Sequence, residues 1–290
     1  MTTASDWVQG ARLRTLPAAA APVLVGSGAA AHLDAFDLGR AALALGVALA
    51  LQVGVNYAND YSDGIRGTDV DRVGPLRLTA SGTASPRSVK GAAFAAFGLA
   101  ALLGLWLVSI TGQWWLVAVG AAAILAAWGY TGGRRPYGYR GLGEVGVFTF
   151  FGLVAVLGTT YTQAGELSWP AWVGAVAVGM LACALLMANN LRDVPTDALV
   201  GKRTLAVRLG EHRSRRVYAV LVVLPVLLGG IVCAFANPWT LIVLLLLFPS
   251  VALAVTVLLG ARGRALVPVL MFTGLLELAF GVLLGVGLAI

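Results

Sequence analysis

Two clusters of acidic and amide side chains carry the clearest chemistry in the sequence. They occupy residues 56–63 and 189–197, each at the end of an apolar stretch, and each opens with the pattern Asn-x-x-x-Asp. A carboxylate near a bilayer is costly unless it faces a cavity, a partner or a cation. Two such clusters therefore need an explanation in a chain with only 13 acidic residues. Carboxylate oxygens are ligands that Mg²⁺ prefers, so the clusters predict binding of a divalent metal.

The spacing inside the clusters supports this prediction. Asn56 and Asp60 lie four positions apart, and Asp60 and Asp63 lie three apart. On a helix their oxygens would share one face and hold one cation. Two aspartates of the second cluster repeat the spacing, and Pro195 between them predicts that the helix ends there. Helix capping would account for one aspartate at most. The predicted metal ligands are Asn56, Asp60, Asp63, Asn189, Asp193 and Asp197, and two Mg²⁺ are the predicted cofactor.

Basic side chains follow each cluster closely in the sequence. Hard oxygen ligands beside Arg and Lys are typical of a site for a magnesium diphosphate. A third segment, residues 130–140, adds further basic and aromatic groups on the same side of the membrane. Each arginine on its own could also be a simple topology marker. The predicted diphosphate ligands are Arg66, Arg72, Arg134, Lys202 and Arg203.

The composition predicts the elements that must position these residues. With 59% hydrophobic residues, 11% charged residues and a mean hydropathy of +0.87, the chain is predicted to be an all-α, polytopic membrane protein. Turn residues at 111–113 and 236–238 divide apolar runs that are too long for one crossing. Nine stretches are long enough to cross about 30 Å of hydrocarbon. They lie at about residues 15–32, 40–58, 88–110, 114–131, 145–163, 171–190, 216–236, 238–259 and 266–288.

The basic residues predict the orientation in the bilayer. With nine spans, 19 of the 20 Lys and Arg fall on one side, and only Arg40 falls on the other. Positive charge marks the cytoplasmic side, so a cell-membrane protein with a cytoplasmic N-terminus is expected, and both acidic clusters face the cytoplasm. The net charge of +7 is explained by topology. Nucleic acid is not an expected partner.

The two clusters also indicate how the chain is organised. They end the second and the sixth predicted spans, so a four-helix unit recurs with the motif at the end of its second helix. One membrane domain, residues 1–290, is expected, with pseudo-repeats at about 10–140 and 141–262 and a final helix at about 266–288. Repeats of this kind can bring their motifs together over a central cavity. Some transporters are built in the same way.

At these positions the sequence resembles a known family. The paired acidic motifs of a nine-helix protein are similar to those of the intramembrane aromatic prenyltransferases, the UbiA superfamily, which is named for the 4-hydroxybenzoate enzyme of ubiquinone synthesis. Three segments, 12–17, 59–77 and 189–206, resemble the 1,4-dihydroxy-2-naphthoate prenyltransferases of menaquinone synthesis. The first motif of family members often has two aspartates four apart. Here they are three apart, which leaves Asp63 and Asn56 open as the second ligand.

The resemblance implies a reaction and two substrates. A polyprenyl group would pass from polyprenyl diphosphate to carbon 2 of 1,4-dihydroxy-2-naphthoate, with loss of carbon dioxide and diphosphate, giving demethylmenaquinone. Magnesium would neutralise the leaving diphosphate, and apolar walls with Tyr130 would shield the allylic cation from water. The tail would lie in the lipid bilayer. Arg12 or Arg14, at the mouth of the first span, is expected to bind the acceptor's carboxylate.

Three alternatives share parts of this pattern. A sibling prenyltransferase with another acceptor, such as 4-hydroxybenzoate, would have the same motifs and a different pocket. The membrane CDP-alcohol phosphotransferases use Asp-x-x-Asp-Gly, which residues 60–64 match, but the rest of their motif is missing and the second cluster is left unexplained. A cation-coupled transporter would need charge near the middle of the bilayer, where Glu277 is the main acidic candidate.

Overall fold

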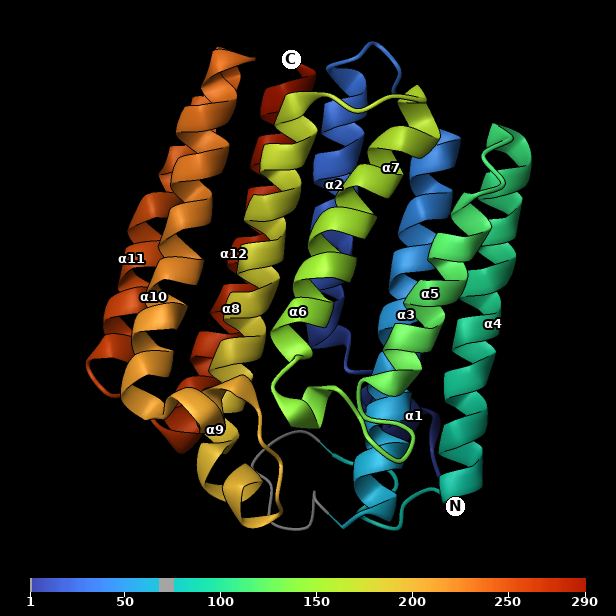
Figure 1. The fold of residues 1–290 in the computed structure, drawn as a ribbon, viewed down its shortest axis with the longest axis vertical. Coiled ribbons are helices and arrows are strands. Elements are labelled where there is room, and N and C mark those ends of the chain that lie inside the picture. Colours follow the sequence, from blue (N-terminus) through green and yellow to red (C-terminus); the bar gives the residue numbers. More distant parts are fainter. Residues whose placement is uncertain (1, 68–75) are drawn as a thin grey trace.

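The computed structural model of the chain describes residues 2–67 and 76–290, and all regular structure in these residues is helical (Figure 1). The α-helices are α1 (Ala4–Ala11), α2 (Leu16–Ala31), α3 (Leu38–Ile65), α4 (Pro86–Thr111), α5 (Leu116–Gly129), α6 (Gly143–Val147), α7 (Ala155–Ala164), α8 (Trp169–Leu199), α9 (Leu205–Leu209), α10 (Glu211–Leu227), α11 (Leu247–Leu258) and α12 (Leu266–Ala289). The 3-10 segments are η1 (Leu13–Thr15), η2 (Gly138–Arg140), η5 (Cys233–Phe235), η6 (Pro238–Leu246) and η7 (Gly263–Ala265), and two π-helical segments are η3 (Phe148–Val154) and η4 (Leu228–Val232).

The described residues contain seven helical runs that are long and apolar enough to cross a membrane. The shorter apolar helix α5 and the 16-residue α2 coincide with the two remaining predicted spans. The predicted all-helical, multi-span fold is confirmed. The count of nine crossings, the pseudo-repeat boundaries and the cytoplasmic orientation stay predictions. The seven runs are Leu38–Ile65, Pro86–Thr111, Gly143–Ala164, Trp169–Leu199, Glu211–Phe235, Pro238–Leu258 and Gly263–Ala289.

Local sequence explains where the helices begin and end. Helix α4 starts after Ser85, whose hydroxyl accepts a hydrogen bond from the Ser88 amide at 3.1 Å. It ends at Gly112, which has a φ of 72°, a left-handed conformation that glycine adopts without strain. The predicted break near residue 237 also lies between helices, and the Asn237 side chain accepts from the Trp239 amide at 3.1 Å.

Helix α8 does not end near Pro195, so that prediction is wrong. The helix continues to Leu199 and carries the whole second cluster. Proline removes one backbone hydrogen bond, but the turn around it is held in another way, because the Thr196 hydroxyl donates to the Asp193 carbonyl at 3.0 Å. The first cluster likewise lies inside a helix, because α3 extends past Asp63 to Ile65.

Small residues let the long helices approach each other closely. A Cβ at Gly28 of α2 would lie 2.2 Å from the Gly285 carbonyl oxygen of α12, so the two backbones are in contact there. Interfaces of this kind are typical of membrane helices, which associate by close packing and not by burial of apolar surface from water. The helices run along the long axis of the molecule, and the ends of α3 and α8 that carry the clusters lie at the same lower end in Figure 1, together with α1 and α9. The fold therefore brings the two acidic clusters to one end of the bundle.

Candidate active site

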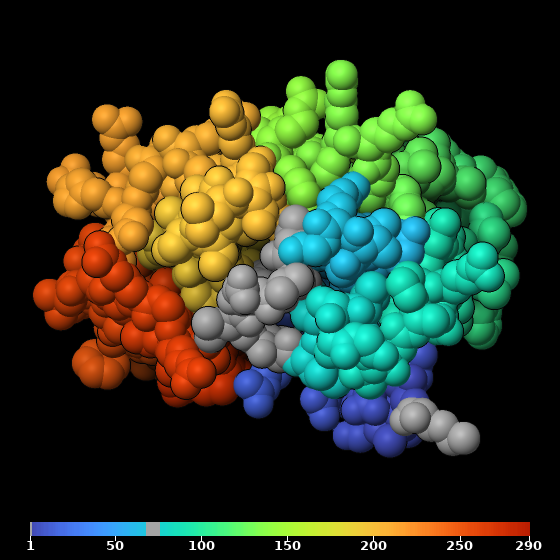
Figure 2. All heavy atoms as spheres, turned by 90° about the horizontal axis from the view of Figure 1, so that it is seen from below, coloured from blue at the N-terminus to red at the C-terminus, as the bar shows by residue number. Residues whose placement is uncertain are grey.

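A cavity of about 2070 Å³ lies between the helices and is lined by residues from both clusters. Its polar part contains Asn59, Asp63, Asn189, Asp193 and Asp197, and its walls are largely apolar. Figure 2 shows this end of the molecule face on, with the segments around the ends of α3 and α8 on either side of its centre. The cavity is therefore a pocket with charge at one end and hydrocarbon-like walls beyond it.

Asp60 is the cluster residue that the structure places differently from the prediction. It is fully buried and is not among the described residues that line the cavity. One carboxylate oxygen accepts from the Leu78 amide at 2.9 Å and the other accepts from the Thr79 amide at 2.8 Å. Gly64, one turn later, makes room for this segment, because a Cβ there would lie 2.5 Å from the side chain of Thr79. Asp60 thus ties residues 78–79 to α3, a position that does not favour it as a metal ligand.

Asn56, Asn59 and Asp63 of α3 all line the cavity, and Asn59 and Asp63 are the two closest to the end of the helix. The side-chain oxygen Oδ1 of Asn59 accepts from the Thr131 hydroxyl at 2.7 Å. The Asp63 carboxylate accepts a short hydrogen bond from the Tyr139 hydroxyl and lies 3.4 Å from the Lys202 ammonium. That ammonium also lies 4.6 Å from the centre of the Tyr139 ring. Asp63 therefore connects α3 with η2 and with the segment that follows α8.

The second cluster is organised by an arginine within it. Arg192 donates from Nε and Nη2 to the two oxygens of Asp193, at 2.6 and 2.7 Å, which is a bidentate pair. Its Nη2 also donates to the side-chain oxygen Oδ1 of Asn189 at 3.0 Å. Asp197 lines the cavity one turn further along α8. The two clusters thus present carboxylates and amides to one space, with a basic group beside each.

Asn56 holds the N-terminal segment against α3. Its Nδ2 donates to the Ala11 carbonyl and to the Thr15 hydroxyl oxygen, each at 2.9 Å. Arg12, between them, has a φ of 52°, a conformation that is uncommon for a residue with a side chain. Arg12 and Arg14 both line the cavity. This position agrees with the role expected for them and leaves Asn56 as an anchor for the segment that carries them.

The predicted diphosphate ligands are spread more widely than the sequence suggested. Lys202 lines the cavity, whereas Arg66, Arg134 and Arg203 are exposed and do not appear among its described lining residues. The Arg66 guanidinium donates to the carbonyls of Thr131 and Gly133, so it joins two segments of backbone. Arg72 lies outside the described residues.

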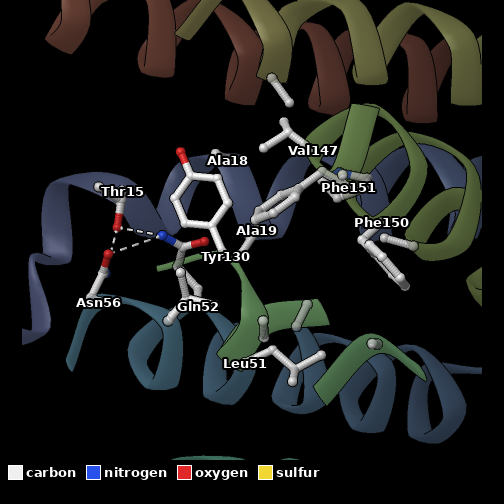
Figure 3. Close-up of a pocket in the computed structure, with 18 of the residues that line it drawn as sticks. Thr15, Ala18, Ala19, Leu51, Gln52, Asn56, Tyr130, Val147, Phe150 and Phe151 are labelled. Atoms are coloured by element: carbon white, nitrogen blue, oxygen red, sulfur yellow. Dashed lines mark hydrogen bonds between the residues drawn. The ribbon is translucent and has the colours of Figure 1, made fainter. Parts of the chain in front are cut away.

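Aromatic side chains form the wall next to the polar part. Tyr130 and Tyr137 both line the cavity, and their rings meet edge to face with centroids 5.6 Å apart. Burial raises the pKa of Tyr137, which lies between the helices α5 and α6, to about 12, so this phenol stays neutral. Figure 3 shows Tyr130 beside Phe151 and Val147. Electron-rich faces without charge are suited to a cationic hydrocarbon.

The donor chemistry of the site fits magnesium bound together with a phosphate ligand. Within residues 2–67 and 76–290, no group of three or more Asp, Glu, His or Cys side chains is arranged to hold an ion alone. Magnesium commonly takes one or two protein carboxylates and completes its shell with substrate phosphates and water. Asp63, Asp193 and Asp197, with the amides of Asn59 and Asn189, supply such a partial set from two sides of the cavity.

Sequence reasoning missed several residues of this site. Asn59 forms a second Asn-x-x-x-Asp pattern with Asp63, and that repeat was available in the sequence. Arg192 stands inside the second cluster, but its spacing does not show that it faces its neighbour Asp193. Tyr139 carried no signal beyond being aromatic in a basic segment. Gln52, one turn before Asn56, also lines the cavity and was not predicted.

Comparison with known proteins agrees with this architecture. Residues 19–276 match the UbiA prenyltransferase family. The chain is 53% identical to a 1,4-dihydroxy-2-naphthoate octaprenyltransferase of Mycobacterium tuberculosis, over 100% of this chain and 98% of that protein. It is 42% identical to the protein of the same name from Escherichia coli, over 78% of this chain and 74% of that one.

Solved structures give the same result for the fold. A UbiA homolog from Archaeoglobus fulgidus bound to GPP and Mg²⁺ superposes with a TM-score of 0.67 at 16% identity, over 95% of this chain and 98% of that chain. The apo structure of a UbiA homolog from Aeropyrum pernix K1 also has a TM-score of 0.67, at 17% identity, over 94% of this chain and 95% of that chain. The two carboxylate-bearing helix ends over one apolar cavity agree with these comparisons. The chain belongs to the UbiA prenyltransferase family, as the match over residues 19–276 and the relatives show.

Proposed function

We propose that this protein transfers a polyprenyl group from polyprenyl diphosphate to 1,4-dihydroxy-2-naphthoate in menaquinone synthesis. The products are demethylmenaquinol, which is the reduced form of demethylmenaquinone, together with diphosphate and carbon dioxide. The observation that carries the proposal is the cavity, in which carboxylates and basic groups from α3 and α8 meet at one end of an aromatic, apolar pocket. The names of the relatives that align with nearly the whole chain support the choice of acceptor.

The bond changes can be assigned to the two ends of this pocket. The carbon–oxygen bond of the allylic diphosphate breaks, and diphosphate leaves with the electron pair. Carbon 2 of the electron-rich hydroquinone ring forms the new carbon–carbon bond. Its carboxylate then leaves as carbon dioxide, and the released electron pair restores the aromatic ring. Atoms and electrons balance without an oxidant or a reductant.

The residues at the polar end would stabilise the leaving diphosphate. Magnesium, when bound, supplies positive charge that offsets the charge developing on the diphosphate. Asp63, Asp193 and Asp197 would hold it, with the amide oxygens of Asn59 and Asn189 assisting, and two ions fit the number of carboxylates. In the structure the carboxylates of Asp63 and Asp193 are paired with Lys202 and Arg192. When substrate binds, these two cations would turn to the phosphate oxygens, so that acids bind the metal and bases bind the diphosphate.

The remaining walls would hold the other parts of the two substrates. Tyr130 and Phe151 present apolar ring faces beside the cavity (Figure 3), which would exclude water from the allylic cation. Arg12 or Arg14 would bind the acceptor carboxylate until it leaves. Trp115 and Trp172 line the cavity and are 57% and 49% exposed. This exposure supports an exit for the isoprenoid tail between helices into lipid. The distribution of Lys and Arg supports a polar mouth on the cytoplasmic side of the cell membrane.

The test is a steady-state assay of the purified protein in detergent with polyprenyl diphosphate, acceptor and Mg²⁺. Release of diphosphate and of carbon dioxide is expected only when both organic substrates are present, and chelation of Mg²⁺ should stop both. Product from 4-hydroxybenzoate, with none from the naphthoate, would identify a sibling enzyme instead. Diphosphate release that does not depend on the aromatic acceptor would contradict prenyl transfer. If no substrate is turned over, the transporter alternative would be favoured.

A further inference from the structure

Gln52 presents to the cavity a buried oxygen that has no hydrogen-bond partner in the described part of the chain. The residue lies on α3, is only 8% exposed, and lines the cavity. Its Oε1 has no hydrogen-bond partner among the described residues. Figure 3 shows this oxygen turned away from Thr15 and Asn56 and toward Tyr130. Buried polar atoms are nearly always hydrogen-bonded, so an orphaned acceptor in a ligand cavity points to a ligand that donates.

The network behind Gln52 fixes the direction of its amide. The Ala11 and Arg12 carbonyls at the end of α1 can only accept hydrogen bonds. The first accepts from Asn56 Nδ2 and the second accepts the proton of the Thr15 hydroxyl, each at 2.9 Å. Thr15 Oγ1 can then only accept, and it does so from Asn56 Nδ2 and from Gln52 Nε2, again at 2.9 Å.

Each hydrogen-bond donor in this network then has an acceptor. The second proton of Gln52 Nε2 faces Asn56 Oδ1 at 3.5 Å. With its nitrogen committed to Thr15 and Asn56, Gln52 must direct Oε1 the other way, into the cavity. The backbone carbonyls of Ala11 and Arg12 therefore set the direction of a series of side-chain hydrogen bonds that ends in one acceptor, Gln52 Oε1.

Only one of the substrate groups in the proposed reaction can satisfy that acceptor. The isoprenoid tail has no donor, and an ionised diphosphate is an acceptor only. The ring hydroxyls of the dihydroxynaphthoate can donate. The 1-hydroxyl lies next to the carboxylate and bonds to it internally, which leaves the 4-hydroxyl. We propose, on the basis of the function proposed above, that Gln52 Oε1 accepts a hydrogen bond from the 4-hydroxyl of the aromatic acceptor and so selects the reduced hydroquinone.

The position of Gln52 along the helix agrees with this assignment. It precedes Asn59 by seven residues, or roughly 10 Å along the axis at 1.5 Å per residue. That separation leaves room for a diphosphate and the reacting carbon between the polar end and the ring. Arg12 and Arg14 shortly precede Thr15, the η1 residue that orients Gln52, so the acceptor's carboxylate and 4-hydroxyl would be held by neighbouring groups. A quinone has only acceptor oxygens, so it could not donate a hydrogen bond to Gln52 Oε1, and the two oxygens would repel each other.

The proposal is tested by combining Gln52→Leu with an acceptor analogue whose 4-hydroxyl is a methyl ether. With the natural naphthoate, Gln52→Leu should raise the KM for the naphthoate about tenfold and leave the KM for polyprenyl diphosphate within about twofold, since only a hydrogen bond to the naphthoate is lost. With wild type, the ether should be about tenfold worse than the natural acceptor. With Gln52→Leu the ether should carry no further penalty, because both changes remove the same bond.

The chain offers a matched control and a second variant. Gln113 Oε1 is also buried without a partner among the described residues, but this glutamine donates to the Tyr161 carbonyl and does not line the cavity. Gln113→Leu should therefore leave both KM values unchanged. Gln52→Met, which keeps the length of the side chain, replaces Gln52→Leu if that variant does not fold.

Two outcomes would overturn the role of Gln52. One is an acceptor KM that stays at the wild-type value in both Gln52 variants. The other is an ether penalty that is as large in the variants as in wild type. A wild-type protein that prenylates only another phenol would refute the naphthoate assignment and not the role of Gln52. The same comparison, made with that phenol and its methyl ether, would then decide the role of Gln52.

Discussion

The ends of α3 and α8 carry the same kinds of side chain and use them differently. On α8, Asp193 lines the cavity and is held by the arginine beside it. On α3, Asp60 turns away from the cavity and binds two backbone amides, and Asp63 takes its place at the cavity wall. The comparison shows that the role of a carboxylate in a motif, as a metal ligand or as an anchor for backbone, depends on the groups that its oxygens bind.

The structure also changes the register in which the two clusters correspond. Aligning Asn56 and Asp60 with Asn189 and Asp193 pairs the buried Asp60, which is not a described lining residue, with a residue that lines the cavity. Aligning Asn59 with Asn189 instead, 130 positions later, places Asp63 opposite Asp193. All four of these residues line the cavity. In this register Asp60 corresponds to Asn190, which donates to the Glu144 carboxylate at 3.1 Å. On each helix, the residue that follows Asn59 or Asn189 therefore holds a neighbouring segment.

The two clusters differ further in the source of their positive partner. Asp193 pairs with Arg192 of the same helix, whereas Asp63 pairs with Lys202, which lies beyond the end of α8. The first cluster is therefore completed by the second half of the chain. Its charge balance therefore depends on the packing of the two halves, whereas Asp193 has a partner within its own helix.

The largest effect is expected from removing the cavity-facing carboxylates. Asp63→Asn and Asp193→Asn should each lower kcat at least about a hundredfold, the scale of losing one electrostatic stabiliser of the transition state. Each should also raise the Mg²⁺ concentration that gives half-maximal rate, because a ligand is lost. Titration of Mg²⁺ at saturating substrates measures both effects. Near-normal rates at limiting Mg²⁺ would refute the assignment of these two residues to the metal.

A somewhat smaller effect is expected at Lys202. Lys202→Gln should raise the donor KM about ten- to a hundredfold, the scale of a hydrogen bond to a charged group, and should leave the acceptor KM nearly unchanged. Arg203→Gln and Arg134→Gln are matched controls, since both side chains are exposed and lie off the cavity wall. If the controls raise the donor KM as much as Lys202→Gln does, the diphosphate is bound outside the described cavity wall.

A tenfold effect on the other substrate is expected at the mouth of the cavity. Either Arg12→Met or Arg14→Met should raise the acceptor KM about tenfold, because a charge-assisted hydrogen bond to the carboxylate is lost. An analogue without the carboxylate should bind to wild type and variant alike. Normal acceptor binding in both variants would place the carboxylate elsewhere in the cavity, with Arg77 and Arg264, which also line it, as the next candidates.

The sequence was sufficient for the helices and for the meeting of the clusters. Apolar run lengths and turn residues such as Gly112 are local signals, and they predicted helices that the structure confirms. The roles of Asp60 and Asp63 were not accessible in this way. Three positions on a helix differ by only about 60°, so spacing treats the two as equivalent. The choice is made by the Leu78 and Thr79 amides, which come from a segment whose path the spacing does not encode.

Arg66 and Gln52 illustrate the same limit from two sides. Arg66 is a residue type that often binds phosphate, but its guanidinium donates to backbone carbonyls instead. Gln52 has no motif around it, and its role follows only from counting the donors of Thr15 and Asn56. Hydrogen-bond partners distant in sequence decide both cases. Composition and spacing cannot supply them.

The smallest change in rate is expected at Asp60, and it tests the comparison of the two clusters most directly. Asp60→Asn keeps one acceptor for the two amides and turns an NH₂ group toward the other, in a position that is fully buried. Leaving one buried amide unsatisfied should destabilise the protein by about 1–3 kcal/mol, read as a lower midpoint of thermal unfolding in detergent. The Mg²⁺ concentration for half-maximal rate should stay at the wild-type value, because the anchor holds backbone and not the ion.

Asp63→Asn should differ from Asp60→Asn in its Mg²⁺ dependence. Its rate and Mg²⁺ dependence should change strongly because its carboxylate lines the cavity. Its thermal midpoint should also fall, because the buried Lys202 ammonium loses its partner. If Asp60→Asn instead shifts the Mg²⁺ dependence as far as Asp63→Asn does, Asp60 reaches the ion during turnover. The register of the first cluster would then return to Asn56 and Asp60, and the segment at residues 78–79 would have to release the carboxylate when substrate binds.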